Sequence, residues 1–303
     1  MRHGNGKEQE SRSVGSWLAG GGLFVLLYFV MSKGLGAALA GIVHRMPQEG
    51  EAIPLAMVLP RYVGFAAAVI AATALVARWD GRRLDAYGLA DHRFLARFAW
   101  GCLVGLGSIC GFVLFLRSQH LLVIAMPGGT GAQVITLGLG WAFLFFLVAL
   151  VEEMLFRGYL LFAAARRIGW LPSALLLAVA FVVYHWWNAG ENGVGLANIA
   201  LVGLVDALSI YYTRSLWWVL GYHAAWDWGE SFLWGAADSG KMVEGYLFHV
   251  SPTGPALLSG GTAGPEGSVY NVVVLLIAAL GMVLWWGRGN RRLDGDQARV
   301  PIS

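Results

Sequence analysis

The sequence contains few charged residues for its length. Asp, Glu, Lys and Arg make up 13% of the 303 residues and hydrophobic residues make up 57%, whereas soluble globular chains have about 25% charged residues. This deficit argues against a soluble enzyme with a large core and indicates an integral membrane protein surrounded by a lipid bilayer. The net charge of +3 is small and most basic residues lie in short loops, so no nucleic-acid partner is expected.

Cysteine is also scarce, because Cys102 and Cys110 are the only two. Both lie in one apolar segment, and on a helix their Cα atoms would be about 12 Å apart, too far for a disulfide. They therefore indicate nothing about the redox compartment. A small-residue cleavage site is likewise missing after the first apolar run, so this run is expected to be retained as a helix.

Long apolar runs are abundant instead. A helix needs about 20 mostly apolar residues to cross a bilayer, and eight segments meet this requirement: 17–40, 55–77, 94–116, 133–162, 171–188, 194–212, 215–234 and 269–286. The sequence thus predicts an all-α, polytopic membrane helix bundle with about eight transmembrane helices. Residues 1–303 are expected to form a single membrane domain.

Lys and Arg alternate in abundance between successive loops and tails. Alternate segments hold 14 of these residues, and the other four loops hold three: Arg45, Arg117 and Lys241. Because basic residues concentrate on the cytoplasmic side, both termini are predicted to be cytoplasmic, in a bacterial cytoplasmic membrane. Segment 235–268, rich in Gly, Pro and Ser, is then an extracytoplasmic loop.

Glycines recur in segment 94–116. Gly101 and Gly105 form one pair spaced by four residues, and Gly107 and Gly111 form another. Such pairs allow a neighbouring helix to approach closely. General tolerance of glycine in membrane helices is an equally good explanation.

The stretch VEEMLFRGYL places Glu152, Glu153 and Arg157 in an otherwise apolar segment. A charged side chain within the bilayer costs at least ~2.5–3.5 kcal/mol on insertion scales and usually faces the bundle interior. Glu153 and Arg157 are four residues apart in the order that favours an ion pair on a helix. Glu152, rotated by about 100°, has no such partner. The pair is therefore interpreted as structural and Glu152 as the free group. A buried ion-pair cluster that only fixes helix packing is the alternative interpretation.

Two further segments carry ionisable groups at helical spacing. FVVYHWWN contains Phe181 and His185, and GYHAAWDW contains His223 and Asp227. At 1.5 Å per residue, Glu152, His185 and Asp227 lie about 20 Å from the cytoplasmic ends of their helices and His223 about 14 Å. We therefore expect Glu152 and the two histidines to line one cytoplasm-accessible cavity.

Three further residues lie near these motifs without being part of them. Asp206 has no motif around it and is interpreted as a packing or gating group. Trp226 and Glu230 are expected to line the same cavity as the histidines.

These three motifs resemble those of the CPBP intramembrane proteases, which include the CAAX prenyl endopeptidases and bacteriocin-immunity-type membrane proteins. The order of the motifs, the spacing within each and their placement on successive apolar segments all agree. The resemblance covers residues 130–234, expected to be the catalytic core helices. One position departs from it, since the family often has Asn where this sequence has Asp227.

The resemblance implies an intramembrane endopeptidase that hydrolyses a peptide bond of a membrane-associated peptide or protein. Glu152 is expected to act as general base and then general acid, and His185 to share or orient the water. His223, steadied by Asp227, would donate to the oxyanion. Glu153 and Arg157 would brace the site.

Several alternatives stay open on sequence grounds. A metal-free mechanism is favoured slightly over one in which zinc is held by His185, His223 and a carboxylate such as Asp227. A secondary transporter could use the same ionisable groups, although the inverted repeats expected for one are not evident. A non-catalytic scaffold or immunity protein could also retain the motifs. The sequence sets neither the substrate, including whether it is prenylated, nor the oligomeric state.

Overall fold

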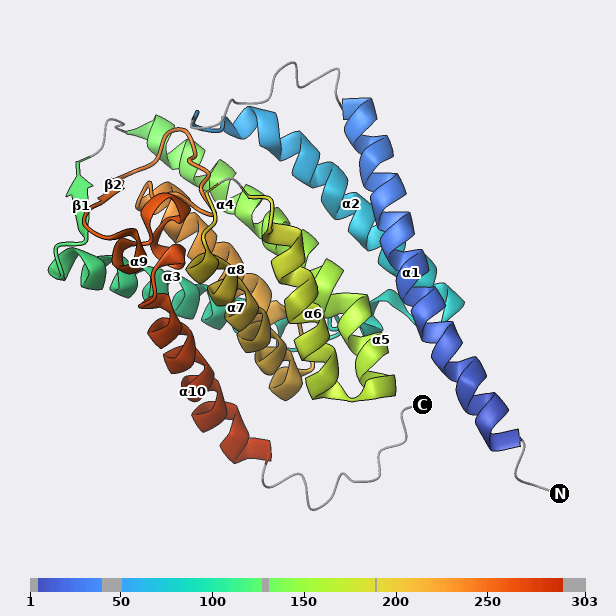
Figure 1. Ribbon diagram of the computed structural model, residues 1–303. Coiled ribbons are helices and arrows are strands. Elements are labelled where there is room, and N and C mark those ends of the chain that lie inside the picture. The colour runs from blue at the N-terminus through green and yellow to red at the C-terminus, as the bar shows by residue number, and fades with distance from the viewer. Residues whose placement is uncertain (1–4, 40–50, 127–130, 189, 291–303) are drawn as a thin grey trace.

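The computed structural model describes residues 5–39, 51–126, 131–188 and 190–290. Arg2, Arg45, Arg291, Arg292 and Arg299, which the orientation argument used, lie outside these ranges. The α-helices are α1 (Asn5–Leu39), α2 (Leu55–Trp79), α3 (Phe94–Ser118), α4 (Ala132–Glu153), α5 (Tyr159–Ile168), α6 (Trp170–His185), α7 (Gly193–Thr213), α8 (Trp217–Asp227), α9 (Ala256–Ser259) and α10 (Asn271–Asn290). Figure 1 shows them as an elongated bundle with α1 and α10 at opposite margins.

Helices occupy each of the eight predicted apolar segments, with most bounds within a few residues. Five described helices are long and apolar enough to cross a membrane: Leu18–Gly36, Leu55–Trp79, Phe94–Ser118, Ala132–Ile168 and Gly193–Thr213. The helices Trp170–His185 and Asn271–Gly287 are apolar but shorter. The chain is therefore a mostly helical integral membrane protein, whereas the eight-span count stays a prediction.

The all-α expectation is wrong in one detail. Strand β1 (Leu122–Ala125) pairs antiparallel with β2 (His249–Pro252), so that Leu122 lies opposite Pro252 and Ala125 opposite His249. The residues of β1 lie in the loop after α3, and those of β2 in segment 235–268. Each strand has only four residues, too few for the apolar-length criterion to detect, so the sheet was not predicted.

Two π-helical turns interrupt the helices that carry the predicted motifs. Met154–Gly158 joins α4 to α5, and Trp228–Leu233 continues α8. Each begins directly after a motif residue, Glu153 in one case and Asp227 in the other. Single π turns inside helices are frequent at functional sites because they re-aim side chains.

Short connections fix the neighbouring helices. Gly169, with φ of 86°, lies between α5 and α6 and provides the positive φ that a tight helix-to-helix turn requires. Asn192 caps α7, since its Oδ1 accepts from the backbone N–H groups of Val194 and Gly195 at 2.9 Å each. Both turns hold α6 and α7 beside the end of α4.

The two glycine pairs of α3 have different surroundings. A Cβ at Gly101 or Gly105 would collide with the backbone of Trp218 or Tyr222 on α8, and one at Gly221 would collide with Phe98 on α3. This pair therefore provides the close approach that the sequence predicted. A Cβ at Gly107 or Gly111 would meet nothing within 4 Å, so the second pair serves no close helix contact among the described residues.

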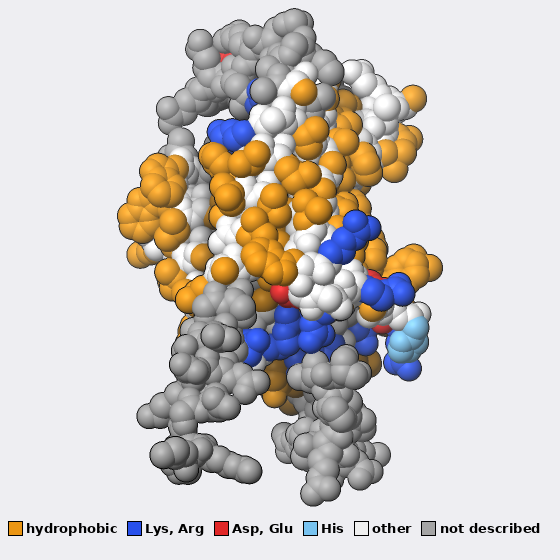
Figure 2. Space-filling view, turned by 90° about the vertical axis from the view of Figure 1, so that its right-hand side faces the viewer, with side chains coloured by type: hydrophobic (Ala, Val, Ile, Leu, Met, Phe, Trp, Pro, Cys, Tyr) orange, Lys and Arg blue, Asp and Glu red, His pale blue; other side chains and the backbone are white. Residues whose placement is uncertain are grey.

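The surface has the character expected of a membrane protein. Figure 2 shows hydrophobic side chains over the middle of one face and a cluster of Lys and Arg at its lower end. Large apolar side chains such as Leu26, Leu103 and Ile135 are more than half exposed. Exposed apolar side chains of this number are typical of a lipid-facing surface.

Candidate active site

The acidic pair lies at the end of α4 and is buried. Glu152 is 7% exposed, and Glu153 is fully buried together with Arg157. Arg157 Nη1 donates to Glu153 Oε1 at 3.3 Å, which is the ion pair that the four-residue spacing predicted. The guanidinium also lies over the ring of Phe181, 4.1 Å from the ring centroid. The predicted pair is therefore part of a packed contact between α4, its π turn and α6.

His223 on α8 contacts three carboxylates. Its Nδ1 lies 3.0 Å from Glu153 Oε1, and because an ionised carboxylate only accepts, the ring N–H donates. Its Nε2 lies 3.8 Å from Glu152 Oε2 and 3.4 Å from Asp227 Oδ2. Acceptors thus face both ring nitrogens, an arrangement that a ring protonated at both satisfies. The link from Glu153 to His223 joins the first and third motifs.

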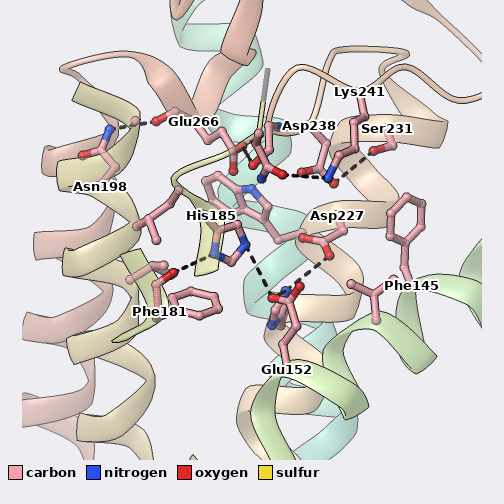
Figure 3. A pocket seen from close by; sticks show the side chains of 18 of the residues that line it. Phe145, Glu152, Phe181, His185, Asn198, Asp227, Ser231, Asp238, Lys241 and Glu266 are labelled. Atoms are coloured by element: carbon pink, nitrogen blue, oxygen red, sulfur yellow. Dashed lines mark hydrogen bonds and ion pairs between the residues drawn. The ribbon is translucent and has the colours of Figure 1, made fainter. Parts of the chain in front are cut away.

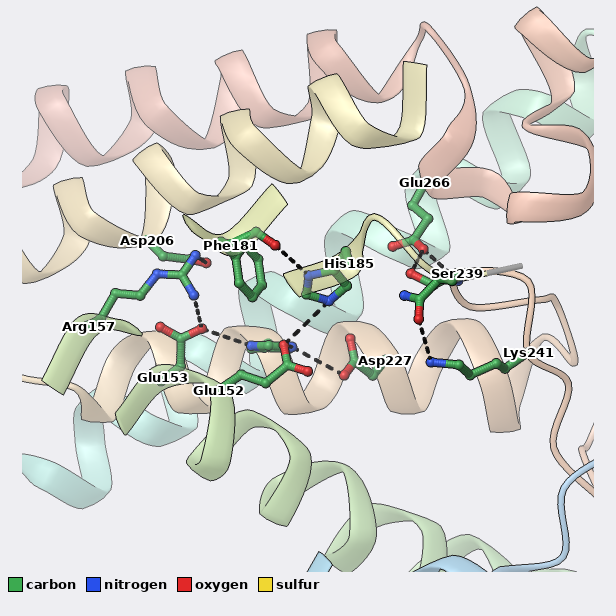
Figure 4. A network of polar contacts seen from close by, with 12 residues as sticks. Glu152, Glu153, Arg157, Phe181, His185, Asp206, Asp227, Ser239, Lys241 and Glu266 are labelled. Carbon is green, nitrogen blue, oxygen red and sulfur yellow. Dashed lines mark hydrogen bonds and ion pairs between the residues drawn. The ribbon is translucent and has the colours of Figure 1, made fainter. Parts of the chain in front are cut away.

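His185 on α6 approaches Glu152 from another direction. Its Nδ1 donates to the backbone carbonyl of Phe181 at 2.9 Å, since a carbonyl oxygen can only accept. In a neutral ring this bond leaves Nε2 without a proton, and Nε2 lies 3.8 Å from Glu152 Oε2. Figure 4 shows the dashed contact between the His185 ring and Glu152. The second motif therefore fixes the tautomer of its own histidine.

Asp206 on α7 belongs to the same site, although no partner for it was evident from the sequence. It is 2% exposed, and its Oδ2 lies 3.6 Å from Arg157 Nη2. Arg157 therefore lies between two carboxylates, Glu153 and Asp206 (Figure 4). The available signal was an acidic residue in an apolar segment, since such residues are paired inside membrane bundles.

A cavity of about 180 Å³ adjoins the site and has apolar and polar walls. Its lining on α4 starts at Glu152 and continues through Val148, Leu144 and Trp141, with no residue past Glu152 toward α5. On α7 it likewise runs from Asp206 back toward Gly195. Figure 3 shows Glu152, His185 and Asp227 at one end and Lys241 and Glu266 at the other.

The direction of this cavity disagrees with one prediction. The cavity leads from Glu152 toward segment 235–268, which the charge pattern assigns to the outside, and away from the arginine-rich end of α5. If segment 235–268 lies outside, the cavity extends toward the outside. The sequence had instead predicted access to the cavity from the cytoplasm. The depth estimate measured distances to helix ends, and it carried no information about the end at which the helices separate.

The far end of the cavity holds a second group of carboxylates. Glu230, fully buried, accepts from Trp226 Nε1 at 2.9 Å. Both residues were expected to line the cavity; Trp226 does, whereas Glu230 is not among its lining residues. Glu266 Oε1 accepts from the backbone N–H of Ser239 at 2.6 Å and from its hydroxyl at 2.8 Å. Sequence reasoning did not find Glu266, because it lies in a loop without a motif.

Two carboxyl groups of segment 235–268, those of Asp238 and Glu266, have altered acidities. Burial raises the pKa of Asp238 to about 7, the nearby Asp227 carboxylate adds to the rise, and Lys241 opposes it. Burial also raises the pKa of Glu266 well above its ordinary value, and Asp238 contributes to the same rise. Both effects arise from crowding of carboxyl groups away from water.

No group of three His, Cys, Asp or Glu side chains with a metal-holding arrangement occurs in the described part of the chain. Of the three residues predicted as zinc ligands, His223 and Asp227 are in contact, and Glu152 is the carboxylate that lies near both histidines. The geometry around the histidines thus centres on Glu152, and the zinc set stays a prediction.

Comparison with known proteins agrees with the motif reading. Residues 134–229 match the family model of the type II CAAX prenyl endopeptidase Rce1-like proteins. The match runs from α4 into the π turn after α8, and it includes Glu152, His185 and His223. No curated protein matches the chain. Residues 134–229 are therefore a domain of the Rce1-like type II CAAX prenyl endopeptidase family.

Proposed function

We propose that the chain is an intramembrane endopeptidase in which Glu152 activates the hydrolytic water. The observation that supports this most is the position of Glu152 Oε2, 3.8 Å from Nε2 of both His185 and His223. These gaps are too long for direct hydrogen bonds, but one water about 2.8 Å from each atom would span them. A buried carboxylate beside such a water has the placement of a general base.

In the proposed first step, Glu152 takes a proton from the water while the water oxygen attacks the peptide carbonyl carbon. His185 Nε2, left as an acceptor by the bond from Nδ1 to Phe181, accepts the second water hydrogen and orients the nucleophile. In the second step Glu152 donates its proton to the amide nitrogen as the C–N bond breaks. The products are an amine and a carboxylic acid, which ionises, and Glu152 is again a carboxylate.

His223 is the proposed donor to the oxyanion that forms between these steps. Glu153 holds the Nδ1–H group, which directs Nε2–H toward the side of Glu152 where the substrate carbonyl would lie. Donors placed in advance at such a point lower the barrier because they need no reorganisation. Arg157 and Asp206 act through Glu153 and are positioning residues. Asp227, 3.4 Å from the same Nε2, supports the protonated ring.

The family implies a peptide or protein substrate, and the membrane helices imply that it is membrane-associated. The walls on α2 and α4, which include Val58, Tyr62 and Phe145, would contact apolar side chains of that substrate. A prenylated peptide with a C-terminal CAAX sequence is the first probe that the family suggests.

Cleavage can be tested without a known substrate. New protein N-termini would be labelled in membranes that carry the wild type, Glu152→Gln or Glu244→Gln, and purified protein would be given a farnesylated CAAX peptide. Glu244 is exposed and outside the cavity, so Glu244→Gln is the matched carboxylate-to-amide control. Termini present with the wild type and the control but absent with Glu152→Gln support the proposal. Identical termini in all three membranes would favour a non-catalytic scaffold.

Metal dependence is tested on the same preparations. We expect activity to survive a strong chelator and elemental analysis to find well under one zinc per chain. Stoichiometric zinc, together with loss of cleavage on chelation and recovery on adding zinc, would instead establish a zinc mechanism.

A further inference from the structure

A large apolar groove lies between α3 and α10, separate from the catalytic cavity. Its volume is about 980 Å³, and its floor is formed by buried side chains that include Phe112, Trp218 and Met282. Trp218 stacks on Tyr222, which lines the catalytic cavity, so α8 separates the two spaces. The groove therefore belongs to a different surface of the protein from the proposed active site.

The depth of this groove comes from glycines, which have no side chain. Gly107 and Gly111 of α3 and Gly281 of α10 line it, and a Cβ at any of them would meet nothing within 4 Å. The α10 helix packs instead mainly against α7, where Trp286 contacts Tyr212. This is the second glycine pair of α3, which has no close helix partner among the described residues. Its effect is to leave open space along α3 in the groove.

One end of the groove is aromatic and the other is basic. Phe115 and Tyr270 lie at one end, with ring centroids 5.3 Å apart. Arg93 and Arg97 line the opposite end, which the charge pattern assigns to the cytoplasm. Arg97 is held by Asp91 at 2.8 Å. For the exposed guanidinium of Arg93, no partner is found in the described part of the chain.

We propose that this groove binds an anionic phospholipid of the cytoplasmic leaflet, with an acyl chain along Gly107 and Gly111 and the phosphate at Arg93. The apolar channel matches the acyl chain in chemistry, and the free guanidinium matches the charge of the headgroup. Basic pockets between membrane helices on the cytoplasmic side are typical sites for such headgroups. Charge complementarity at Arg93 favours this occupant over a second copy of the chain, which would have to bring its own anion to that end.

The test uses the full-length protein in nanodiscs of mixed phosphatidylcholine and phosphatidylglycerol, with native mass spectrometry to count retained lipids. The wild type should retain phosphatidylglycerol in preference to phosphatidylcholine. Arg93→Gln should weaken that preference about fivefold, the contribution expected of one arginine near anionic lipid. Gly111→Leu should reduce retention of both lipids, because its side chain fills the channel.

Two matched variants serve as controls. Arg78→Gln removes an exposed arginine at the end of α2, and Gly22→Leu adds the same side chain to an open position on α1. Neither lies in the groove, so both should retain lipid as the wild type does. All variants should elute as the wild type does in size exclusion, because no residue exchanged packs against a neighbour.

Three results would overturn the proposal. Equal lipid preference in Arg93→Gln and Arg78→Gln would remove the headgroup assignment. Unchanged retention in Gly111→Leu would show that the lipids bind elsewhere. A mass spectrum of lipid-free dimers that become monomers in Gly111→Leu would show that a second copy fills the groove.

Discussion

The two adjacent glutamates at the end of α4 face regions with opposite properties. On the Glu153 side, Arg157, Asp206 and His223 close around a carboxylate that has no exposure, and neither Glu153 nor Arg157 lines the cavity. On the Glu152 side, no direct hydrogen bond to the carboxylate is found among the described residues, and its nearest polar groups stand 3.8 Å away. One residue along the helix thus separates a sealed region around Glu153 from an open region on the cavity side of Glu152.

This contrast suggests a division of labour. Glu153 and Arg157 of the sealed region do not line the cavity, so they can hold His223 in place but cannot bind substrate. Groups in the open region keep capacity for a water and a substrate carbonyl. The division holds only if the two glutamates respond differently to the same substitution.

The largest effect is expected from Glu152→Gln. An amide cannot take the proton of the water, so cleavage should fall by about 10²–10⁴-fold, the usual contribution of a general base. The folded protein should be as stable as the wild type within about 0.5 kcal/mol, because the 3.8 Å contacts of Glu152 with His185 and His223 are too long to stabilise the fold strongly. Activity of purified protein on a confirmed peptide and the midpoint of thermal unfolding measure the two quantities. Wild-type activity in Glu152→Gln would refute its assignment as base.

Glu153→Gln and Arg157→Ala should lower stability as well as activity. Each removes one member of a buried pair and leaves the other charge without its partner, which typically costs about 3–5 kcal/mol. Arg157→Ala should be the more harmful, because it strands both Glu153 and Asp206. Thermal unfolding in detergent, compared with Glu152→Gln, checks the contrast. If both glutamine variants proved equally stable, the sealed region would not be the structural half of the site.

Much of this arrangement follows from the sequence alone. Apolar length predicted helices at all eight positions, because a backbone in lipid must satisfy its own hydrogen bonds. Four-residue spacing predicted the contacts of Glu153 with Arg157 and of His223 with Asp227. These contacts lie within one helix or across its π turn, so local geometry was enough.

Contacts between distant segments could not be predicted in the same way. The bond from Glu153 to His223 and the pair of Arg157 with Asp206 depend on the rotation of one helix against another. Helical depth fixes how far along each axis a residue lies, but it does not fix that rotation. The direction of the cavity and the position of Glu266 over its far end depend on loops, whose paths have no periodic signal.

Asp227 tests the boundary between the two regions. It faces the cavity but contacts the Nε2 of a ring that Glu153 holds from the sealed side. Asp227→Asn should keep substantial activity, and the alkaline limb of its pH–rate profile should move to lower pH, since one carboxylate no longer supports the charged ring. Asp227→Ala should lose most activity. A profile for Asp227→Asn that overlays the wild type would remove the support role.

The smallest effect is expected at Asp238, at the far end of the open region. Its pKa in the folded protein is about 7 because of burial and the nearby Asp227 carboxylate, whereas an unperturbed Asp has a pKa of about 3.9. Between these values the folded state binds more protons than the unfolded state. The contribution of Asp238 to stability is therefore fully present below about pH 4 and is lost as pH rises through about 7.

Asp238→Asn cannot ionise, so the fall in thermal stability between pH 5 and pH 8 should be shallower than in the wild type. The Asp238→Asn variant keeps the neighbouring polar side chains of Ser231 and Lys241, which lie at the same end of the cavity. Glu244→Gln, in the same segment but exposed, should keep the wild-type slope. Equal slopes in all three proteins would show that Asp238 is ionised in the folded state at neutral pH, and the open region would then carry more negative charge toward its substrate.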